Sequence, residues 1–281
     1  MIYGHVVSAG LVMLVAGASA ALAQGGDVNV AVAGASSTVQ RAAPVPRPSP
    51  KRGPSRKMRR AAHKLLRLGG GYLKWGAPRL GSAADVTYAF VRRHHVTRGA
   101  RNCQAMVPLS GLLAASPSLS LAVLRRAARE AFAMWSAVAA IRFHEVQDVA
   151  LANILIGAQA RPRGTAFANV QFEPLGTQTR SRRDSTVRRR PGAVHRLTRS
   201  LVCLNPRQRW KVGFDGDLLS FDLRYTFAHE IGHAIGLDHP PARGQLMGYR
   251  YTEQFAGLQF GDVRGVVQLY GRPLLKRLRW R

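Results

Sequence analysis

A short histidine-rich segment near residue 230 constrains this chain more than any other feature. From His229 to His239 the sequence reads H-E-x-x-H-x-x-G-x-x-H. On a helix, His229 and His233 lie one turn apart on the same face, so both imidazoles can bind one metal ion. Gly236 can adopt backbone angles that end the helix, and the chain can then return His239 as a third ligand. Three neutral histidines leave one position on zinc open for water, which is typical of catalytic sites. The alternative is an ordinary amphipathic helix with three surface histidines. Under that interpretation, the spacing of the three histidines, the glutamate and the glycine would be a coincidence.

The amino-terminal residues indicate export. An apolar run of small residues extends from about Val6 to Ala23 and ends in an A-x-A cleavage pattern before Gln24. The run is too short and too rich in Ala and Gly to be a good membrane span. No Lys or Arg precedes it, which a wrongly assigned start codon or an unusual signal would explain. A lipid-facing anchor is the lesser alternative. We expect residues 1–23 to be a signal peptide, and the protein to be secreted or to reside in the periplasm or cell envelope.

The chain contains two cysteines, Cys103 and Cys203. In an exported protein such a pair most simply forms one disulfide. The bridge would close a loop of about a hundred residues, which stabilises the folded state by up to ~4–5 kcal/mol on the chain-entropy account. Two unpaired buried thiols are the alternative, and the expected compartment favours the disulfide.

The formal net charge of +28 is extreme and unevenly distributed. Basic residues concentrate in three segments, Arg41–Arg67, Arg180–Arg199 and Arg272–Arg281. Such segments attract polyanions, but they carry few aromatic residues and match no nucleic-acid-binding motif. We therefore expect non-specific contact with anionic polymers or lipid surfaces, and no specific recognition of nucleic acid.

The chain divides into a linker, one folded domain and a basic tail. Residues 24–71 are rich in Ala, Pro and Arg, which predicts a disordered basic linker. Within it, Arg56–Leu68 shows helical spacing of leucines, and Gly69–Gly71 would end that helix. The domain is expected from Tyr72 to Gly271, and residues 272–281 form the tail.

Strands alternate with a few helices inside this domain. The predicted strands are 85–91, 141–146, 153–158, 165–172 and 200–204, and residues 178–199 form a basic, mobile loop. One helix spans 118–140 with Ser118 or Ser120 as cap, and the histidine-bearing helix begins near 221–223 with Ser220 or Asp222 as cap. A last helix, 262–270, is capped by Asp262 and ended by Gly271. This order predicts an α+β or mixed α/β domain rather than a doubly wound fold.

With these features the sequence resembles the metzincins and, more narrowly, the matrixin family of zinc endopeptidases (peptidase family M10). The likeness covers about Tyr72 to Gly271. It includes segments outside the metal motif: Tyr72–Gly76, Val86–Phe90, Ala131–Ser136, Ala152–Gly157, Gln245–Gly248 and Gly261–Gly271. The resemblance implies a zincin-like fold, with a twisted five-stranded sheet, about three helices and an active-site cleft. It also implies that the edge strand, here residues 165–172, binds an extended substrate through its backbone.

The same resemblance assigns the site. It implies that His229, His233 and His239 bind zinc, that Glu230 is the general base, and that Met247 forms the floor of the zinc site. Tyr249 follows two residues later, where the serralysin and astacin branches place a tyrosine that can approach the metal. Tyr249 could stabilise an oxyanion or be a packed aromatic, and we favour the second interpretation.

Three departures from the animal matrixins limit the resemblance. The region of their second, structural zinc and their calcium ions carries arginines here, and His195 is its only histidine, so we expect one catalytic zinc without the structural zinc. Clustered arginines repel Ca²⁺, which leaves calcium binding in doubt. Asp215 and Asp217 could ligate an ion, but a simple turn is favoured. The inhibitory P-R-C-G pattern is not matched, because Cys103 stands in R-N-C-Q.

The sequence therefore predicts a secreted zinc-dependent endopeptidase that hydrolyses peptide bonds with a Glu-activated, zinc-bound water. It predicts a monomer acting on a protein or peptide substrate, which the sequence does not identify. The alternative is a catalytically weak or inactive basic protein that binds the cell envelope on a protease fold. Hydrolysis of a non-peptide amide or ester by zinc is a third reading that the motif alone leaves open.

Overall fold

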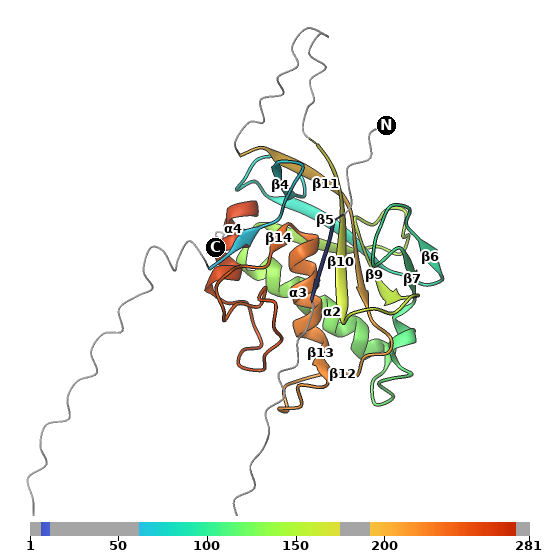
Figure 1. Cartoon of the computed structure of the whole chain (residues 1–281). Coiled ribbons are helices and arrows are strands. Elements are labelled where there is room, and N and C mark those ends of the chain that lie inside the picture. Colours follow the sequence, from blue (N-terminus) through green and yellow to red (C-terminus); the bar gives the residue numbers. More distant parts are fainter. Residues whose placement is uncertain (1–6, 12–61, 175–191, 274–281) are drawn as a thin grey trace, which may run out of the picture.

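A mixed β-sheet forms the centre of the domain in the computed structural model, which describes residues 7–11, 62–174 and 192–273 (Figure 1). Four neighbouring strands of the sheet run parallel, and the fifth, at its edge, is antiparallel to them. In spatial order these strands are β8 (Ile141–Glu145), β5 (Ala84–Phe90), β9 (Ile154–Gln159), β11 (Val194–Leu204) and β10 (Ala166–Glu173). The expected α+β class and five-stranded body are confirmed.

Two pairs of short strands extend this body, β3 (Arg67–Leu68) with β4 (Gly71–Lys74) and β6 (His95–Val96) with β7 (Ala105–Val107). Two further pairs form separate two-stranded sheets, β2 (Lys64–Leu65) with β14 (Leu237–Asp238) and β12 (Trp210–Lys211) with β13 (Phe221–Asp222). Of these, β4 also pairs with β11, and β7 with β9.

Three sequence expectations are wrong. The helix expected in Arg56–Leu68 is absent from its described part, where β2 and β3 form instead. Leu65 and Leu66 are buried in the main core, so the folded domain includes residues that were assigned to the linker. The basic loop expected to reach Arg199 ends earlier, because β11 begins at Val194. Residues 175–191 and the rest of the linker lie outside the described residues.

A segment from the start of the chain lies against β10. Strand β1 (Val7–Leu11) pairs antiparallel with β10, from Val7 opposite Val170 to Leu11 opposite Ala166, and it also contacts the histidine-bearing helix. These residues belong to the expected signal peptide, whose other residues are outside the described part. The outer edge of β10 is thus able to pair with an extended chain.

Helices α2 (Leu121–Val138), α3 (Leu223–Ala234) and α4 (Phe260–Tyr270) accompany the sheet, with the 3-10 helix η1 (Leu109–Leu112). The Ser120 side chain accepts from the Val123 N–H and caps α2, as expected. Helix α4 differs from the expectation, because Gln259 is its cap and Asp262 stands in its first turn. None of the helices in the described residues is long and apolar enough to cross a bilayer.

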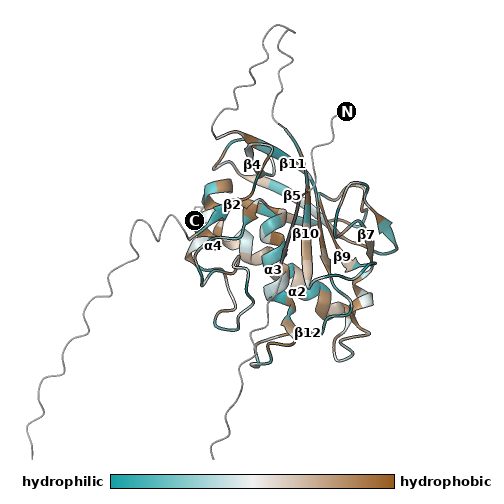
Figure 2. Cartoon of the chain, viewed as in Figure 1, coloured by the Kyte–Doolittle hydropathy of each residue, from teal (hydrophilic) through white to brown (hydrophobic). Residues whose placement is uncertain are grey.

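Helix α3 is buried along almost its whole length. Three aromatic side chains bind carbonyls at or near its C-terminal half: Trp135 Nε1 donates to Ala228 O at 2.9 Å, Trp75 Nε1 to Ala234 O at 3.0 Å, and Tyr270 Oη to Ile235 O at 2.7 Å. Carbonyls at a helix end otherwise lack intrahelical partners. Strand β10, which contacts this helix, is largely hydrophobic (Figure 2). The core therefore holds this helix in one position.

A disulfide joins Cys103 to Cys203 of β11, which confirms that expectation. Beside it, the side-chain oxygen Oδ1 of Asn169 on β10 accepts backbone N–H groups of Arg101, Asn102 and Cys103 at 3.0, 3.2 and 3.1 Å. The loop before β7 is therefore fixed to the sheet next to β10.

Candidate metal centre

The start of α3 sets the direction of the histidine-bearing helix. Asp222 is its cap, as one of the two expected candidates, and its carboxylate accepts the Tyr225 N–H at 2.7 Å. The other carboxylate oxygen accepts the Gly213 N–H at 2.7 Å. His229 and His233 follow on one face of the helix, and neither has any exposed surface.

The turn after α3 returns the third histidine. Gly236 has a φ of 105°, and a Cβ atom there would lie 2.1 Å from the Leu73 carbonyl oxygen, so only glycine fits. The chain continues into β14, where Lys64 Nζ lies 2.7 Å from Asp238 Oδ2. Asp238 Oδ1 accepts the His239 N–H at 2.8 Å. Sequence reasoning missed Lys64 and Asp238, because their pairing joins segments that are distant along the chain.

The three imidazoles converge on one point. Their Nε2 atoms are 3.1 Å apart for His229 and His239, and 3.2 Å apart for each pair with His233. His229 Nδ1 lies 2.7 Å from Leu246 O and His233 Nδ1 lies 2.9 Å from Leu237 O, so these nitrogens donate and the Nε2 lone pairs point inward.

Converging lone pairs cannot hydrogen-bond to one another and require a cation between them. Tetrahedral zinc, with Zn–N distances of about 2.0–2.1 Å, places its ligand nitrogens roughly 3.3 Å apart. Burial, together with the neighbouring imidazoles, lowers the pKa of His229, His233 and His239 to about 3 each. The ligands are therefore neutral at neutral pH, as metal binding requires, and the donor set fits zinc. Among the described residues these three form the group of side chains close enough to hold a metal ion.

Glu230 is completely buried beside this group. Burial raises its pKa well above the ordinary value, and the backbone of Ala168 on β10 partly opposes that rise. Apart from this interaction with the Ala168 backbone, neither carboxylate oxygen has a hydrogen-bond partner among the described residues. An unpartnered buried carboxyl group is unfavourable, so this position suits a group that receives a polar molecule such as water.

The turn that contains Met247 lies beneath α3. Met247 is 2% exposed, and a Cβ atom on Gly232 would lie 2.3 Å from its Sδ, so the glycine between the two helical ligands permits this contact. The Asp262 carboxylate accepts the N–H groups of Leu246 at 2.8 Å, Met247 at 3.1 Å and Gln259 at 2.7 Å. Asp262 therefore fixes the turn whose Leu246 carbonyl orients His229, a role that the sequence did not reveal.

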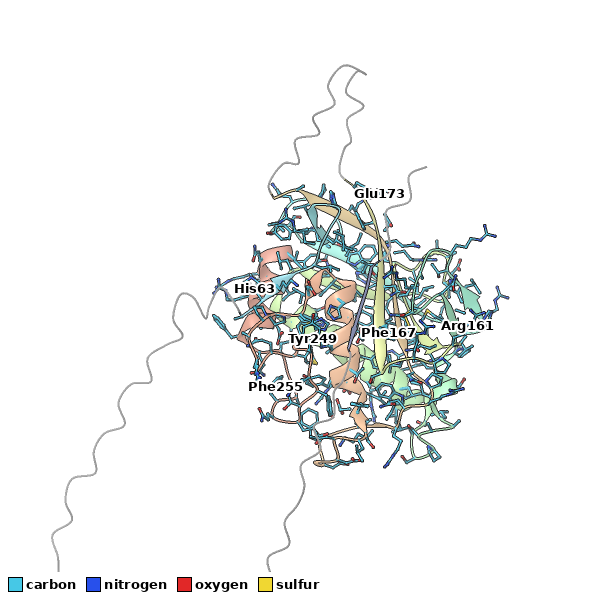
Figure 3. The ribbon with its side chains drawn as sticks, in the orientation of Figure 1. His63, Arg161, Phe167, Glu173, Tyr249 and Phe255 are labelled. Atoms are coloured by element: carbon cyan, nitrogen blue, oxygen red, sulfur yellow. A yellow bond between two sulfur atoms is a disulfide. The ribbon has the colours of Figure 1, made fainter. Side chains whose placement is uncertain are left out.

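Tyr249 lies at the surface of the site. It is 56% exposed, and its ring stacks on His239 with centroids 3.8 Å apart and an interplanar angle of 25°. Figure 3 shows Tyr249 close to α3. Tyr249 thus covers one face of His239, a candidate ligand. It is more exposed than we expected for a packed aromatic side chain, which was the favoured interpretation.

The Asp215 and Asp217 segment forms a turn around a lysine. The Asp217 N–H donates to Asp215 Oδ1 at 2.9 Å, which is the favoured turn. Lys211 Nζ binds the Asp215 carboxylate, Asp217 O at 2.7 Å and Glu253 Oε1 at 2.6 Å. Glu253 Oε2 also accepts the Asp215 and Gly216 N–H groups at 3.0 and 2.7 Å. The cation that these oxygens hold in this structure is the lysine ammonium.

The other histidines among the described residues do not join the metal centre. His63 contacts Gln268, His144 contacts Asp85, and His195 stacks on Phe172. His94 and His95 lie near β6, away from the three converging imidazoles.

Comparison with known proteins agrees with this geometry. A family model described as Matrixin matches residues 111–271, more than half of the chain. Metalloendoproteinase 4-MMP of Arabidopsis thaliana is 30% identical over 162 residues, which cover 56% of this chain and 42% of that protein. Stromelysin-3 of Rattus norvegicus is 32% identical over 154 residues, which cover 54% of this chain and 28% of that protein. The chain thus spans less than half the length of these relatives.

Proposed function

The chain belongs to the matrixin family of zinc metalloendopeptidases, and we propose that it is a secreted enzyme that hydrolyses peptide bonds with Glu230 as general base. The observation that carries this proposal is the convergence of His229, His233 and His239 next to a buried carboxyl group without a partner. The apolar export signal in residues 1–23 supports secretion.

The substrate is proposed to bind in an extended conformation along β10. An edge strand binds a peptide through main-chain hydrogen bonds, and pockets for alternate side chains give specificity. The pairing of β1 with Ala166–Val170 supports this direction of binding, because it is antiparallel and contacts α3. Ala168, whose backbone lies near Glu230, would then be beside the scissile bond.

Each group has a distinct task in hydrolysis. His229, His233 and His239 would hold zinc, which would supply a Lewis acid for the scissile carbonyl and lower the pKa of a bound water. Glu230 accepts the proton of the attacking water and delivers it to the leaving amine. The raised pKa of Glu230 suits a group that must hold a proton between these steps. Met247 and the Leu246 carbonyl support His229, while Tyr249 covers His239.

Replacing Glu230 with Gln tests this assignment. The variant keeps all three ligands and the shape of the side chain, so it should bind zinc with the wild-type stoichiometry. Because it cannot accept a proton, its kcat should fall by about 10²–10⁴-fold or more. Zinc content is measured by elemental analysis, and cleavage by an internally quenched peptide.

The matched control is Glu130→Gln, which changes an exposed carboxylate on α2. The control should retain wild-type activity and metal content. Wild-type activity in the Glu230→Gln variant would exclude Glu230 as the base. Wild-type protein that binds zinc but cleaves no peptide would favour the inactive envelope-binding alternative.

A further inference from the structure

Four arginines border β10 on the side of the β6–β7 hairpin. They are Arg98, Arg101, Arg161 and Arg163, here named the arginine rim. All four are exposed, and none of them has an ion pair among the described residues. By contrast, Arg129, Arg142 and Arg196 each contact a carboxylate.

The backbone fixes the arginine rim at both ends of β10. Gln171 Nε2 donates to Arg98 O at 3.3 Å, and the Arg101 N–H donates to Asn169 Oδ1 at 3.0 Å, both near the C-terminal end of the strand. The Arg163 N–H donates to Gln159 Oε1 at 2.7 Å, just before the strand begins. In the view of Figure 3, Arg161 lies on the side of β10 away from α3, and Phe167 lies at β10 itself.

The alternation of side chains connects the arginine rim to a bound peptide. On β10, Ala166, Ala168 and Val170 pack in the core that contains α3, whereas Phe167 packs in the second core with Cys203. Residues that face each other across antiparallel strands point to the same side of the sheet. Every second side chain of a substrate on β10 would therefore point to the side on which the arginine rim lies.

The charge of this region is not compensated by nearby acidic residues along the chain. There is no Asp or Glu from Val86 to Arg129, and Asp148 is the single acidic residue from Val146 to Phe172. Hydropathy colouring shows the hydrophilic β6 hairpin next to hydrophobic β9 and β10 (Figure 2). A positive field at the edge of a cleft raises the local concentration of anionic groups.

We infer that the arginine rim is a specificity determinant that selects substrates with acidic side chains on both sides of the scissile bond. The inference rests on the proposed peptidase function, and it names the substrate class of that site. Arg98 and Arg101 would contact the amino-terminal side of the peptide, because an antiparallel chain places its earlier residues beside Val170 and Gln171. Arg161 and Arg163 would contact the carboxyl-terminal side.

Two internally quenched peptides test the inference. Both share one neutral core that the wild-type enzyme cleaves, and they differ only in flanking residues that are Asp and Glu in one peptide and Asn and Gln in the other. The measured quantity is the ratio of kcat/KM for the acidic peptide to that for the neutral peptide. For the wild-type enzyme this ratio should be about ten. In each of the double variants, Arg98→Ala/Arg101→Ala and Arg161→Ala/Arg163→Ala, it should fall by about threefold. The fall is modest because each exposed charge pair contributes little on its own.

The control is Arg79→Ala/Arg272→Ala, which removes the same charge from two exposed positions near the end of α4. Helix α4 lies on the opposite side of the molecule from β6 (Figure 1). Its ratio should equal that of wild type. Retained cleavage of the neutral peptide in every variant shows that the peptidase function is intact. A wild-type ratio near one, or an equal fall in the control, overturns the inference. The inference would also be overturned if the kcat/KM ratio were near one while a sulfated polysaccharide bound in a way that depends on the arginine rim. The ligand of the rim would then be an anionic polymer.

Discussion

At the scale of single residues, the ligands of the metal centre could be predicted but their supports could not. His229, His233 and His239 are close in sequence, and their spacing specifies a helix followed by a turn. Asp262 and Lys64 act through contacts that form only when distant segments meet. Sequence reasoning therefore assigned Asp262 to a helix cap and placed Lys64 in a linker.

Asp262→Asn should loosen the turn beneath the zinc helix. The carboxylate is 2% exposed and accepts three backbone N–H groups, and an amide would set its own N–H donors against at least one of them. We expect a loss of about 1–3 kcal/mol in the free energy of unfolding, and weaker zinc binding because Leu246 O orients His229. Urea unfolding and competition with a zinc chelator measure the two effects.

The exposed Asp148→Asn is the control for that experiment. It changes one carboxylate to an amide outside the metal centre and should leave both quantities unchanged. Unfolding and zinc affinity like those of wild type in Asp262→Asn would show that the turn does not depend on this carboxylate.

Tyr249→Phe separates two roles at the same scale. The ring contact with His239 is kept, whereas the hydroxyl is lost. If the ring alone matters, kcat/KM should change by less than about twofold, and Tyr249→Ala should weaken zinc binding. A large fall in kcat for the phenylalanine variant, at unchanged zinc content, would instead assign the hydroxyl to catalysis.

At the scale of elements, hydrophobic periodicity predicted α2, α3, β5, β9 and β10 to within a few residues. It failed where pairing overrides local pattern. The leucines near Leu65 have helical spacing, yet β2 and β3 pair with β14 and β4. The first half of β11 is basic and resembles a loop, but β10 and β4 pair with it on both sides.

The turn around Lys211, which contains Asp215 and Asp217 and contacts Glu253, should make stability depend on pH. Burial opposes the charge of Glu253, but hydrogen bonds from Lys211 and the Gly216 N–H outweigh it and hold its pKa below the ordinary value of 4.5. Because the folded state has the lower pKa, this stabilisation is present above pH 4.5 and is lost as the pH falls further.

Glu253→Gln should therefore unfold more easily than wild type at pH 7, by about 1–3 kcal/mol, and the difference should shrink as the pH falls below 4.5. Urea titrations at pH 7 and pH 4 measure it. Glu130→Gln, at an exposed ion pair, should show little difference at either pH. A difference for Glu253→Gln that grows toward acid would contradict the assigned direction of the pKa.

At the scale of the whole molecule, the architecture places a rigid metal site beside a strand edge that can pair with an extended chain, and beside a positive surface. The disulfide and Asn169 fix the loop before β7 to the sheet, and three aromatic hydrogen bonds fix α3 on the other side of β10. The sequence indicated the charge, but which arginines face β10 depends on the fold.

Zinc titration of the metal-free protein tests the central claim most directly. The protein is stripped with a chelator, zinc is added in known amounts, and cleavage of the quenched peptide is followed against bound metal. We expect no cleavage without metal, a linear rise in activity with zinc, and a plateau at one zinc per chain, because His229, His233 and His239 form one site. Full activity in the metal-free protein, or activity that rises independently of zinc bound at these histidines, would contradict the account.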